Sequence, residues 1–249
     1  MLPIIFKPKY DYELIRLGSS HDGGYLIEKS SLFRTNFLFS FGVSTNWDFE
    51  KDFLKYRKIN LMAFDGSIDD FFWENEKKIA LKKLKKFSFI YLFKMTYTMY
   101  KFKNFFNVNN FQPKFISLSM ENSITFEEAI KYSNFKENFF KIDIEGSEYE
   151  ILDSILNYQN NISGMAIEFH DCNKQINKII NFIRKLKLEI VHIHANNYDD
   201  LKGTDLPKTL EISFAKEPLI KGEFKGLPHR LDKPNRSKSP EIKLSFNEE

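Results

Sequence analysis

Runs of consecutive apolar residues alternate along the chain with segments in which apolar residues recur every three or four positions. Continuous apolar runs are typical of parallel strands buried on both faces, and the longer spacing is typical of helices packed on a sheet. The alternation therefore predicts an α/β fold with a largely parallel sheet. The predicted strands are Asn36–Phe41, Asn60–Phe64, Lys114–Leu118, Asn138–Ile142, Gly164–Phe169, Leu188–His194 and Thr209–Ala215.

Segments with helical spacing connect several of these strands. In the first of them, Phe49, Phe53 and Tyr56 fall on one face of a helix. A connection of this kind between parallel strands is a crossover helix. The predicted crossover helices are Asn46–Lys58, Ser147–Tyr158 and Cys172–Leu186.

Three further segments depart from the alternation within what we expect to be a single domain, residues 1–249. Residues 1–35 contain the Gly23-Gly24 step, which predicts a hairpin in the position of a lid. Residues 69–112 are too long for an ordinary connection and are predicted to be a helical insertion. Residues 227–249 are predicted to run extended over the surface, since they contain several prolines and few helix formers.

Composition and charge narrow the function classes. The 249 residues are 42% hydrophobic and 29% charged, which is the mix of a globular protein. The net charge is only +3, from 37 basic and 34 acidic residues, so nucleic acid is not an expected partner. The one cysteine excludes an intramolecular disulfide, and the first residues lack a secretory signal, so the cytoplasm is the expected location.

The most apolar segment, residues 87–111, is interrupted by Lys94, Lys101 and Lys103, so no transmembrane helix is expected. Paired lysines precede it in the insertion. We expect them to form a solvated face or to contact an anionic substrate or membrane surface. These pairs are Lys77-Lys78, Lys82-Lys83 and Lys85-Lys86.

Polar residues at the carboxyl ends of the strands are the first candidates for a site, because ligands bind there in open parallel sheets. Gly42 follows the first strand and would let a ligand approach the backbone, although the loop lacks the full glycine motif of dinucleotide-binding folds. Asp65 ends the second strand, where an acidic residue can bind ribose hydroxyls. The alternative for Asp65 is a helix cap.

The fourth strand leads into Asp143-Ile144-Glu145-Gly146, an acidic pair followed by a glycine and a predicted helix. Asp143 and Glu145 would share one side of a continued strand and face the ligand. We interpret Glu148 and Glu150 differently, as acidic residues that stabilise a helix N-terminus.

The next two strands end in histidines. Glu168 and His170 share one face of the first, and His192, His194 and Asn196 share a face of the second. Carboxylate and imidazole groups at neighbouring strand ends can bind a divalent cation, or a histidine can act as a general base. The sequence leaves both roles open.

These motifs together resemble the FkbM-type methyltransferases over residues 12–247. The resemblance rests on Lys141-Ile142-Asp143-Ile144-Glu145-Gly146, the Phe39–Trp47 loop, Ile167–His170 and His192–Asn197. It implies a class I, Rossmann-like fold with a seven-stranded, mostly parallel sheet, flanked by helices and with an antiparallel last strand. It also implies O-methylation with S-adenosyl-L-methionine as the methyl donor.

The resemblance assigns residues position by position. The methionine part of the cofactor would contact Phe41, Gly42, Ser44 and Asn46, the ribose Asp65 with Gly66 and Ser67, and the adenine Met120 and Glu121. The loop lacks an acidic residue that is usual in the family, and Asp22, beside Gly23 and Tyr25, or Asp143 would replace it. His194 is the first candidate for the base and His170 the second, with Asp143 orienting the hydroxyl. A Mg²⁺ or Mn²⁺ ion would be bound by Asp143, Glu168 and His194.

The subgroup that the sequence resembles occurs in bacterial surface-polysaccharide clusters. The implied acceptor is a nucleotide-activated sugar, such as a GDP-heptose, for capsular polysaccharide or lipooligosaccharide. Two alternatives remain at this stage: an NAD-dependent oxidoreductase acting on a sugar, and a non-catalytic carbohydrate-binding module. The sequence leaves the oligomeric state open, with a homodimer as one option.

Overall fold

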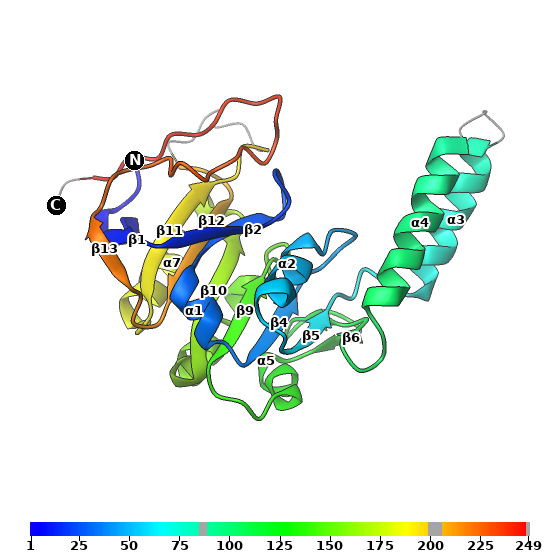
Figure 1. Cartoon of the computed structure of the whole chain (residues 1–249), viewed down its shortest axis with the longest axis horizontal. Helices are drawn as coiled ribbons and strands as arrows, with labels where there is room; N and C mark the ends of the chain where they lie inside the picture. Colours follow the sequence, from blue (N-terminus) through cyan, green and yellow to red (C-terminus); the bar gives the residue numbers. More distant parts are fainter. Residues whose placement is uncertain (85–88, 199–205, 248–249) are drawn as a thin grey trace.

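A seven-stranded sheet in the order β11-β12-β10-β9-β4-β5-β6 forms the centre of the protein in the computed structural model, which describes residues 1–84, 89–198 and 206–247 (Figure 1). β12 is antiparallel to both of its neighbours, and the other adjacent pairs are parallel. The prediction of a mostly parallel sheet with an antiparallel last strand is confirmed. The strands are β4 (Phe37–Phe41), β5 (Asn60–Phe64), β6 (Phe111–Gln112), β9 (Asn138–Ile142), β10 (Ile162–Phe169), β11 (Glu189–Ala195) and β12 (Leu210–Ala215).

Six of the predicted strands lie within two residues of the observed ones. The prediction of Lys114–Leu118 as a sheet strand is wrong. At this edge of the sheet the last strand is β6. It ends before Pro113, which has no N–H group to donate a hydrogen bond to a neighbouring strand. The chain then forms the short β7 (Phe115–Ile116), which pairs with β8 (Ser123–Ile124) outside the main sheet.

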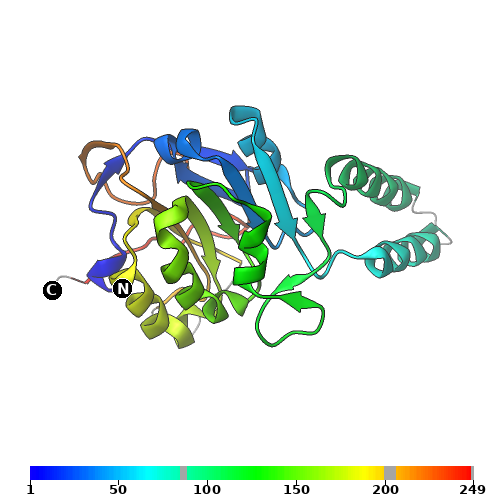
Figure 2. The same cartoon turned by 90° about the horizontal axis from the view of Figure 1, so that it is seen from below.

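Helices cover both faces of the sheet (Figure 2). The side chains of β4 contribute to a hydrophobic core on each face of the sheet. Phe39 packs in the core with α5, α6 and α7, and Leu38 packs in the core with α1 and α2. The segment predicted as one helix from Ser147 begins instead as a 3-10 turn, η3. The elements are α1 (Lys29–Arg34), α2 (Asp48–Tyr56), α5 (Phe126–Ala129), α6 (Leu152–Tyr158), α7 (Cys172–Lys185), η1 (Ile4–Phe6), η2 (Ile130–Tyr132), η3 (Ser147–Glu150) and η4 (Gln159–Asn161).

The predicted N-terminal hairpin is present. It consists of β2 (Leu14–Gly18) and β3 (Gly24–Glu28), which pair antiparallel. Every residue of β3 is buried, so this strand packs firmly on the protein. A second small sheet pairs β1 (Tyr10–Tyr12) with β13 (Ile220–Glu223).

The insertion is a helical arm of two antiparallel helices that projects from the body (Figures 1 and 2). It consists of α3 (Asp70–Leu84) and α4 (Phe89–Phe105). Lys85 and Lys86, two of the predicted basic residues, lie outside the described residues. Within residues 1–84, 89–198 and 206–247, every helix is too short or too polar to cross a bilayer.

Candidate active site

The loop after β4 is fixed by the end of β9. Gly42 has a φ of 75°, and a Cβ at this position would lie 1.6 Å from the carbonyl oxygen of Asp143. The glycine is therefore required by the backbone of the neighbouring strand, whereas the sequence suggested close approach of a ligand. This contact places the Gly42 loop directly beside Asp143.

Asp65 also holds this loop. Its Oδ2 accepts hydrogen bonds from the backbone N–H groups of Val43 (2.9 Å) and Ser44 (2.6 Å). Its Oδ1 accepts from the N–H (2.8 Å) and the hydroxyl (2.6 Å) of Ser67. The carboxylate thus joins the ends of β4 and β5. These four hydrogen bonds occupy the roughly four acceptor positions that an ionised carboxylate offers.

A cavity of about 220 Å³ opens between these loops. It lies where β4 is flanked by β5 on one side and β9 on the other, which is the switch point at which open α/β sheets bind ligands. Six predicted cofactor residues line it: Gly42, Ser44, Asp65, Ser67, Met120 and Asp143. Glu145, which the sequence placed with Asp143 facing the ligand, also lines it. The sequence did not point to the other lining residues, Phe64, Phe115, Ile116, Ile144 and Ser147.

The remaining predicted cofactor residues do not line this cavity. Phe41 is buried in the core, and Gly66 packs against the ring of Phe115. Asn46 donates a hydrogen bond to the carbonyl of Asp22 (3.1 Å) and contacts Gly23, so these three join the hairpin tip to α2. Glu121 is exposed to solvent and does not line the cavity. Tyr25 lies in the acidic cluster described below.

The loop that carries Met120 is held by Glu150. This carboxylate accepts hydrogen bonds from the Ser117 hydroxyl (2.7 Å), the Leu118 N–H (2.6 Å) and the Ser119 hydroxyl (2.8 Å). Burial alone would raise the pKa of Glu150, but these hydrogen bonds lower it. Glu150 lies in the first turn of η3, as the interpretation of a helix-terminal acidic residue predicted, and its side chain in addition holds the loop that leads to Met120.

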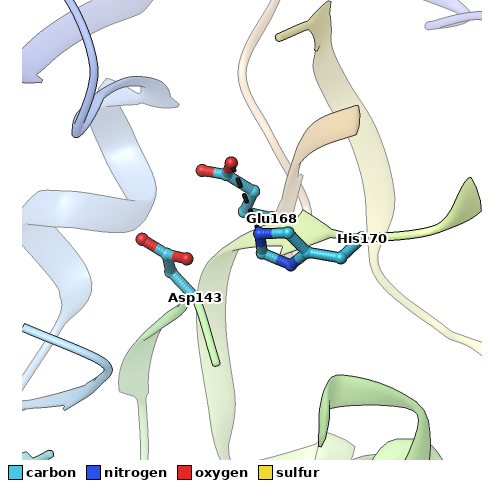
Figure 3. Close-up of side chains that lie close together, drawn as sticks. All are labelled: Asp143, Glu168 and His170. Atoms are coloured by element: carbon cyan, nitrogen blue, oxygen red, sulfur yellow. Dashed lines mark ion pairs between the residues drawn. The ribbon is translucent and has the colours of Figure 1, made fainter. Parts of the chain in front are cut away.

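Asp143, Glu168 and His170 form a cluster beside the cavity (Figure 3), and one oxygen or nitrogen atom of each lies within 4.8 Å of the others. The Tyr25 hydroxyl donates to Glu168 Oε2 (2.9 Å) and contacts Asp143 Oδ2 at 3.3 Å. Asn196 donates to Glu168 Oε1 (3.0 Å). Burial, and then the charge of Asp143, raise the pKa of Glu168 well above its ordinary value.

His170 is oriented by Glu148, which is buried. Glu148 Oε1 accepts from the backbone N–H of His170 (2.6 Å) and lies 3.2 Å from the ring Nδ1. The ring Nε2 points away from Glu148 and lies 3.5 Å from Glu145 Oε2 and 3.8 Å from Glu168 Oε1. Burial alone would lower the pKa of His170, but Glu148 raises it to about 9. Glu148 is thus a positioning residue. It also lies in the first turn of η3, where its Oε2 accepts from the Gly146 N–H (2.8 Å), as the interpretation of a helix-terminal acidic residue predicted.

Lys141 positions Asp143 from within β9. Its Nζ lies 3.1 Å from Asp143 Oδ2 and donates to the Gly42 carbonyl. Burial opposes its charge, but Asp143 raises the pKa of Lys141. A lysine inside an apolar strand was the available sequence signal for this residue.

His194 lies between two carboxylates. Its Nδ1 is 3.1 Å from Glu211 Oε2, and its Nε2 bonds Glu241 of the C-terminal tail. Despite burial, these partners raise the pKa of His194 to about 9. Both ring nitrogens are therefore engaged. Among the described residues, His170 and not His194 completes the set of three clustered donor groups.

The tail runs over the ends of β11 and β12, but it also reaches inward. Asp232 lies 3.0 Å from His192 Nε2, and Asn235 is buried and donates to Glu211. The backbone carbonyls of Arg236 (3.1 Å) and Ser239 (3.0 Å) accept from the Asn197 amide. The N–H of Asp232 also bonds the carbonyl of His229, and the N–H of Ser239 bonds that of Arg236, so the tail contains turns. The sequence predicted neither these turns nor the buried polar contacts.

A larger cavity, of about 500 Å³, lies at the base of the helical arm. Its walls include the start of α2 and the lower half of α4. Neither Asp65 nor Asp143 lines it, so it is separate from the cavity at the switch point. It is lined by Thr45, Asn46, Trp47, Asp48, Lys51, Tyr97, Thr98, Tyr100, Lys101, Asn104 and Phe105.

The strand order, the antiparallel β12 and the cavity at the switch point define a class I methyltransferase fold. No protein-family model and no curated protein matches the sequence. Several solved structures are distantly similar. Three of them are the methyltransferase domain of METTL16 (9% identity, 73% of this chain and 72% of that one, TM-score 0.34), M. jannaschii TYW2 in complex with AdoMet (11%, 75% and 73%, 0.34) and an rRNA methylase from Streptococcus thermophilus (14%, 76% and 93%, 0.33).

Proposed function

We propose that this protein is an S-adenosylmethionine-dependent O-methyltransferase of the FkbM type that acts on a hydroxyl of a nucleotide-activated sugar. One observation carries the proposal: Asp143 belongs both to the cavity at the switch point and to the cluster with Glu168 and His170. A donor bound in the cavity would therefore lie next to ionisable groups that can act on an acceptor.

The cavity suits the parts of the cofactor. A ribose hydroxyl can replace the Ser67 hydroxyl as a donor to Asp65 Oδ1, since both residues line the cavity. Phe115, Ile116 and Met120 supply apolar surface for the adenine. The sulfonium would then lie toward Asp143, whose carboxylate is held in place by Lys141.

Methyl transfer is a displacement at carbon. The acceptor oxygen forms a bond to the methyl carbon, the carbon–sulfur bond breaks, and its electron pair stays on the sulfur. The hydroxyl proton passes to a base. Since the methyl group is already activated, alignment of the two substrates supplies much of the rate.

We assign the base to His170 instead of His194. A base needs a free lone pair, and both nitrogens of His194 face carboxylates. In His170, Nδ1 faces Glu148, while Nε2 lies 3.5 Å from Glu145 Oε2 and 3.8 Å from Glu168 Oε1, farther than the hydrogen-bonded partners of His194. Glu148 raises the pKa of His170 to about 9, and a positive sulfonium nearby would act in the opposite direction and favour the neutral base.

The cluster also fits a divalent cation. Asp143 and Glu168 offer oxygen ligands and His170 offers Nε2, while the bond of Nδ1 to Glu148 is the outer contact usual for a metal-bound histidine. When bound there, Mg²⁺ or Mn²⁺ would lower the pKa of the acceptor hydroxyl. Loss of turnover on chelation, restored by Mn²⁺, would assign His170 as a ligand. Turnover without added cation would assign it as the base.

The cavity at the arm base supports a nucleotide-activated acceptor. Tyr100 offers a ring on which a base can stack. Lys51, which pairs with Asp48, and Lys101, which lies over the ring of Tyr97, offer positive charge for a diphosphate. Lys82 and Lys83 lie in the last turn of α3 and do not line this cavity, so the proposed phosphate contacts are Lys51 and Lys101.

The sheet argues against a nicotinamide-dependent oxidoreductase. The usual dinucleotide-binding fold has the strand order 3-2-1-4-5-6, whereas here the antiparallel β12 separates β10 from β11. Assay of methyl transfer to a panel of nucleotide sugars tests the proposal, with GDP-heptose as one member. His170→Asn should remove most turnover and retain cofactor binding, and His229→Asn serves as the control. Normal turnover in the first variant would overturn the role of His170.

A further inference from the structure

The far end of the helical arm exposes large apolar side chains. Phe89, Ile90 and Phe93 are 65%, 84% and 75% exposed. Phe89 and Phe93 are four positions apart on α4 and so lie on the same face of the helix, with Ile90 beside them. Exposed apolar side chains that are contiguous mark a surface that contacts another molecule.

Lysines surround these side chains. Lys82 and Lys83 lie in the last turn of α3, and Lys94 lies on α4 next to Phe93, and all three are exposed. Between Lys77 and Lys94 the sequence contains no acidic residue. We call Phe89, Ile90, Phe93, Lys82, Lys83 and Lys94 the tip patch.

The positive charge of the arm favours an anionic partner. The described residues of α3 and α4 contain seven lysines and three acidic residues, so the arm carries a net charge of +4, more than the +3 of the whole chain. The rest of the protein is therefore close to neutral, and positive charge is concentrated on the projecting element. Two such arms repel each other, which disfavours a second copy of this chain as the partner.

We propose that the tip patch docks the protein on an anionic lipid surface. Aromatic and aliphatic side chains insert among the acyl chains at the boundary, and lysines beside them contact the negative headgroups. Long lysine side chains can lie along the apolar surface and still reach the headgroups. Since every described helix is unable to span a bilayer, the attachment through this arm is peripheral.

The proposal is tested by cosedimentation of the full-length protein with vesicles of phosphatidylcholine, with and without phosphatidylglycerol. Binding should require phosphatidylglycerol and weaken at high salt. The triple variant Lys82→Gln, Lys83→Gln and Lys94→Gln should bind about tenfold more weakly or worse. The control Lys58→Gln, Lys131→Gln and Lys136→Gln makes the same change in net charge at exposed lysines outside the arm and should bind normally.

The apolar contribution is tested separately with Phe89→Ser, Ile90→Ser and Phe93→Ser. Because these side chains are exposed, the variant should fold normally and lose vesicle binding. The matched control is Leu219→Ser with Ile220→Ser, at residues that are 52% and 51% exposed near β13 (Figure 1). Absence of binding to anionic vesicles would overturn the proposal, as would self-association in solution that the arm variants abolish. Neither result depends on whether the protein transfers methyl groups.

Discussion

The hydroxyl of Tyr25 donates a hydrogen bond to Glu168 Oε2 at 2.9 Å, across 143 positions of the chain. It joins the N-terminal hairpin to the end of β10 and satisfies a buried carboxylate in the candidate active site. The hairpin is therefore part of the site itself.

Tyr25→Phe removes this donor. A buried group that loses its partner costs about 1–3 kcal/mol, so the free energy of unfolding should fall by that amount. Methyl transfer should also fall, while the affinity for S-adenosylmethionine stays unchanged. Urea denaturation and calorimetry measure these effects.

Tyr12→Phe is the matched control for this variant. Tyr12 donates to Glu189 at 3.0 Å, outside the site, so this variant should lose stability and keep its activity. Equal losses of activity in the two variants would show that Tyr25 acts only through stability.

Asp65→Asn should weaken cofactor binding by about tenfold or more, since the amide nitrogen cannot accept the hydrogen bonds that the carboxylate receives from Val43, Ser44 and Ser67. The negative charge that faces the cavity is lost as well. Calorimetric titration with S-adenosylmethionine measures the change. Asp153→Asn, at an exposed position on α6, is the control and should bind normally. Unchanged affinity in Asp65→Asn would remove Asp65 from the cofactor site.

Gly42→Ala should destabilise the protein severely, because its Cβ would meet the carbonyl oxygen of Asp143. Gly226→Ala is the control that measures the cost of the positive φ alone, without a clash of the Cβ. Gly226 has a comparable φ of 95°, and its Cβ would have no neighbour within 4 Å. We expect a cost of about 1–2 kcal/mol at Gly226 and roughly 3 kcal/mol more at Gly42. Similar unfolding midpoints for the two variants would contradict the predicted clash.

The pH dependence of stability tests the pairing of His194. Its pKa is raised from 6.5 to about 9 in the folded protein. Its contribution to stability is therefore complete below pH 6.5 and is lost as the pH rises through about 9. The amount is on the order of 3 kcal/mol. Between about pH 7 and about pH 10, the free energy of unfolding should fall less in His194→Gln than in the unmodified protein. An unchanged fall would mean that Glu211 and Glu241 do not stabilise a charged His194.

The sequence predicted most of the sheet because buried parallel strands form continuous apolar runs. It misplaced the strand at Lys114–Leu118, where an apolar run follows Pro113 and leaves the sheet. It also placed Asp143, Glu168 and His170 at neighbouring strand ends, since strand ends can be located without knowledge of the loops.

Other parts of the site could not be located from apolar runs or strand ends in the sequence. Glu148 and Glu150 look the same in the sequence whether they are exposed on a helix or turned inward to His170 and Ser117. The partner of His194 at Glu241 lies in a tail without periodicity, so no pattern locates it. Long-range polar contacts of this kind depend on the folded chain and not on local spacing.

The most direct test of the central claim is calorimetric titration of the metal-stripped protein with S-adenosylmethionine, repeated with Mn²⁺ and with NAD in place of the methyl donor. We predict binding of S-adenosylmethionine in the micromolar range, about −8 kcal/mol, weakened by Asp65→Asn and absent for NAD. No binding of S-adenosylmethionine with or without Mn²⁺ would contradict the assignment of the cavity and leave only the fold.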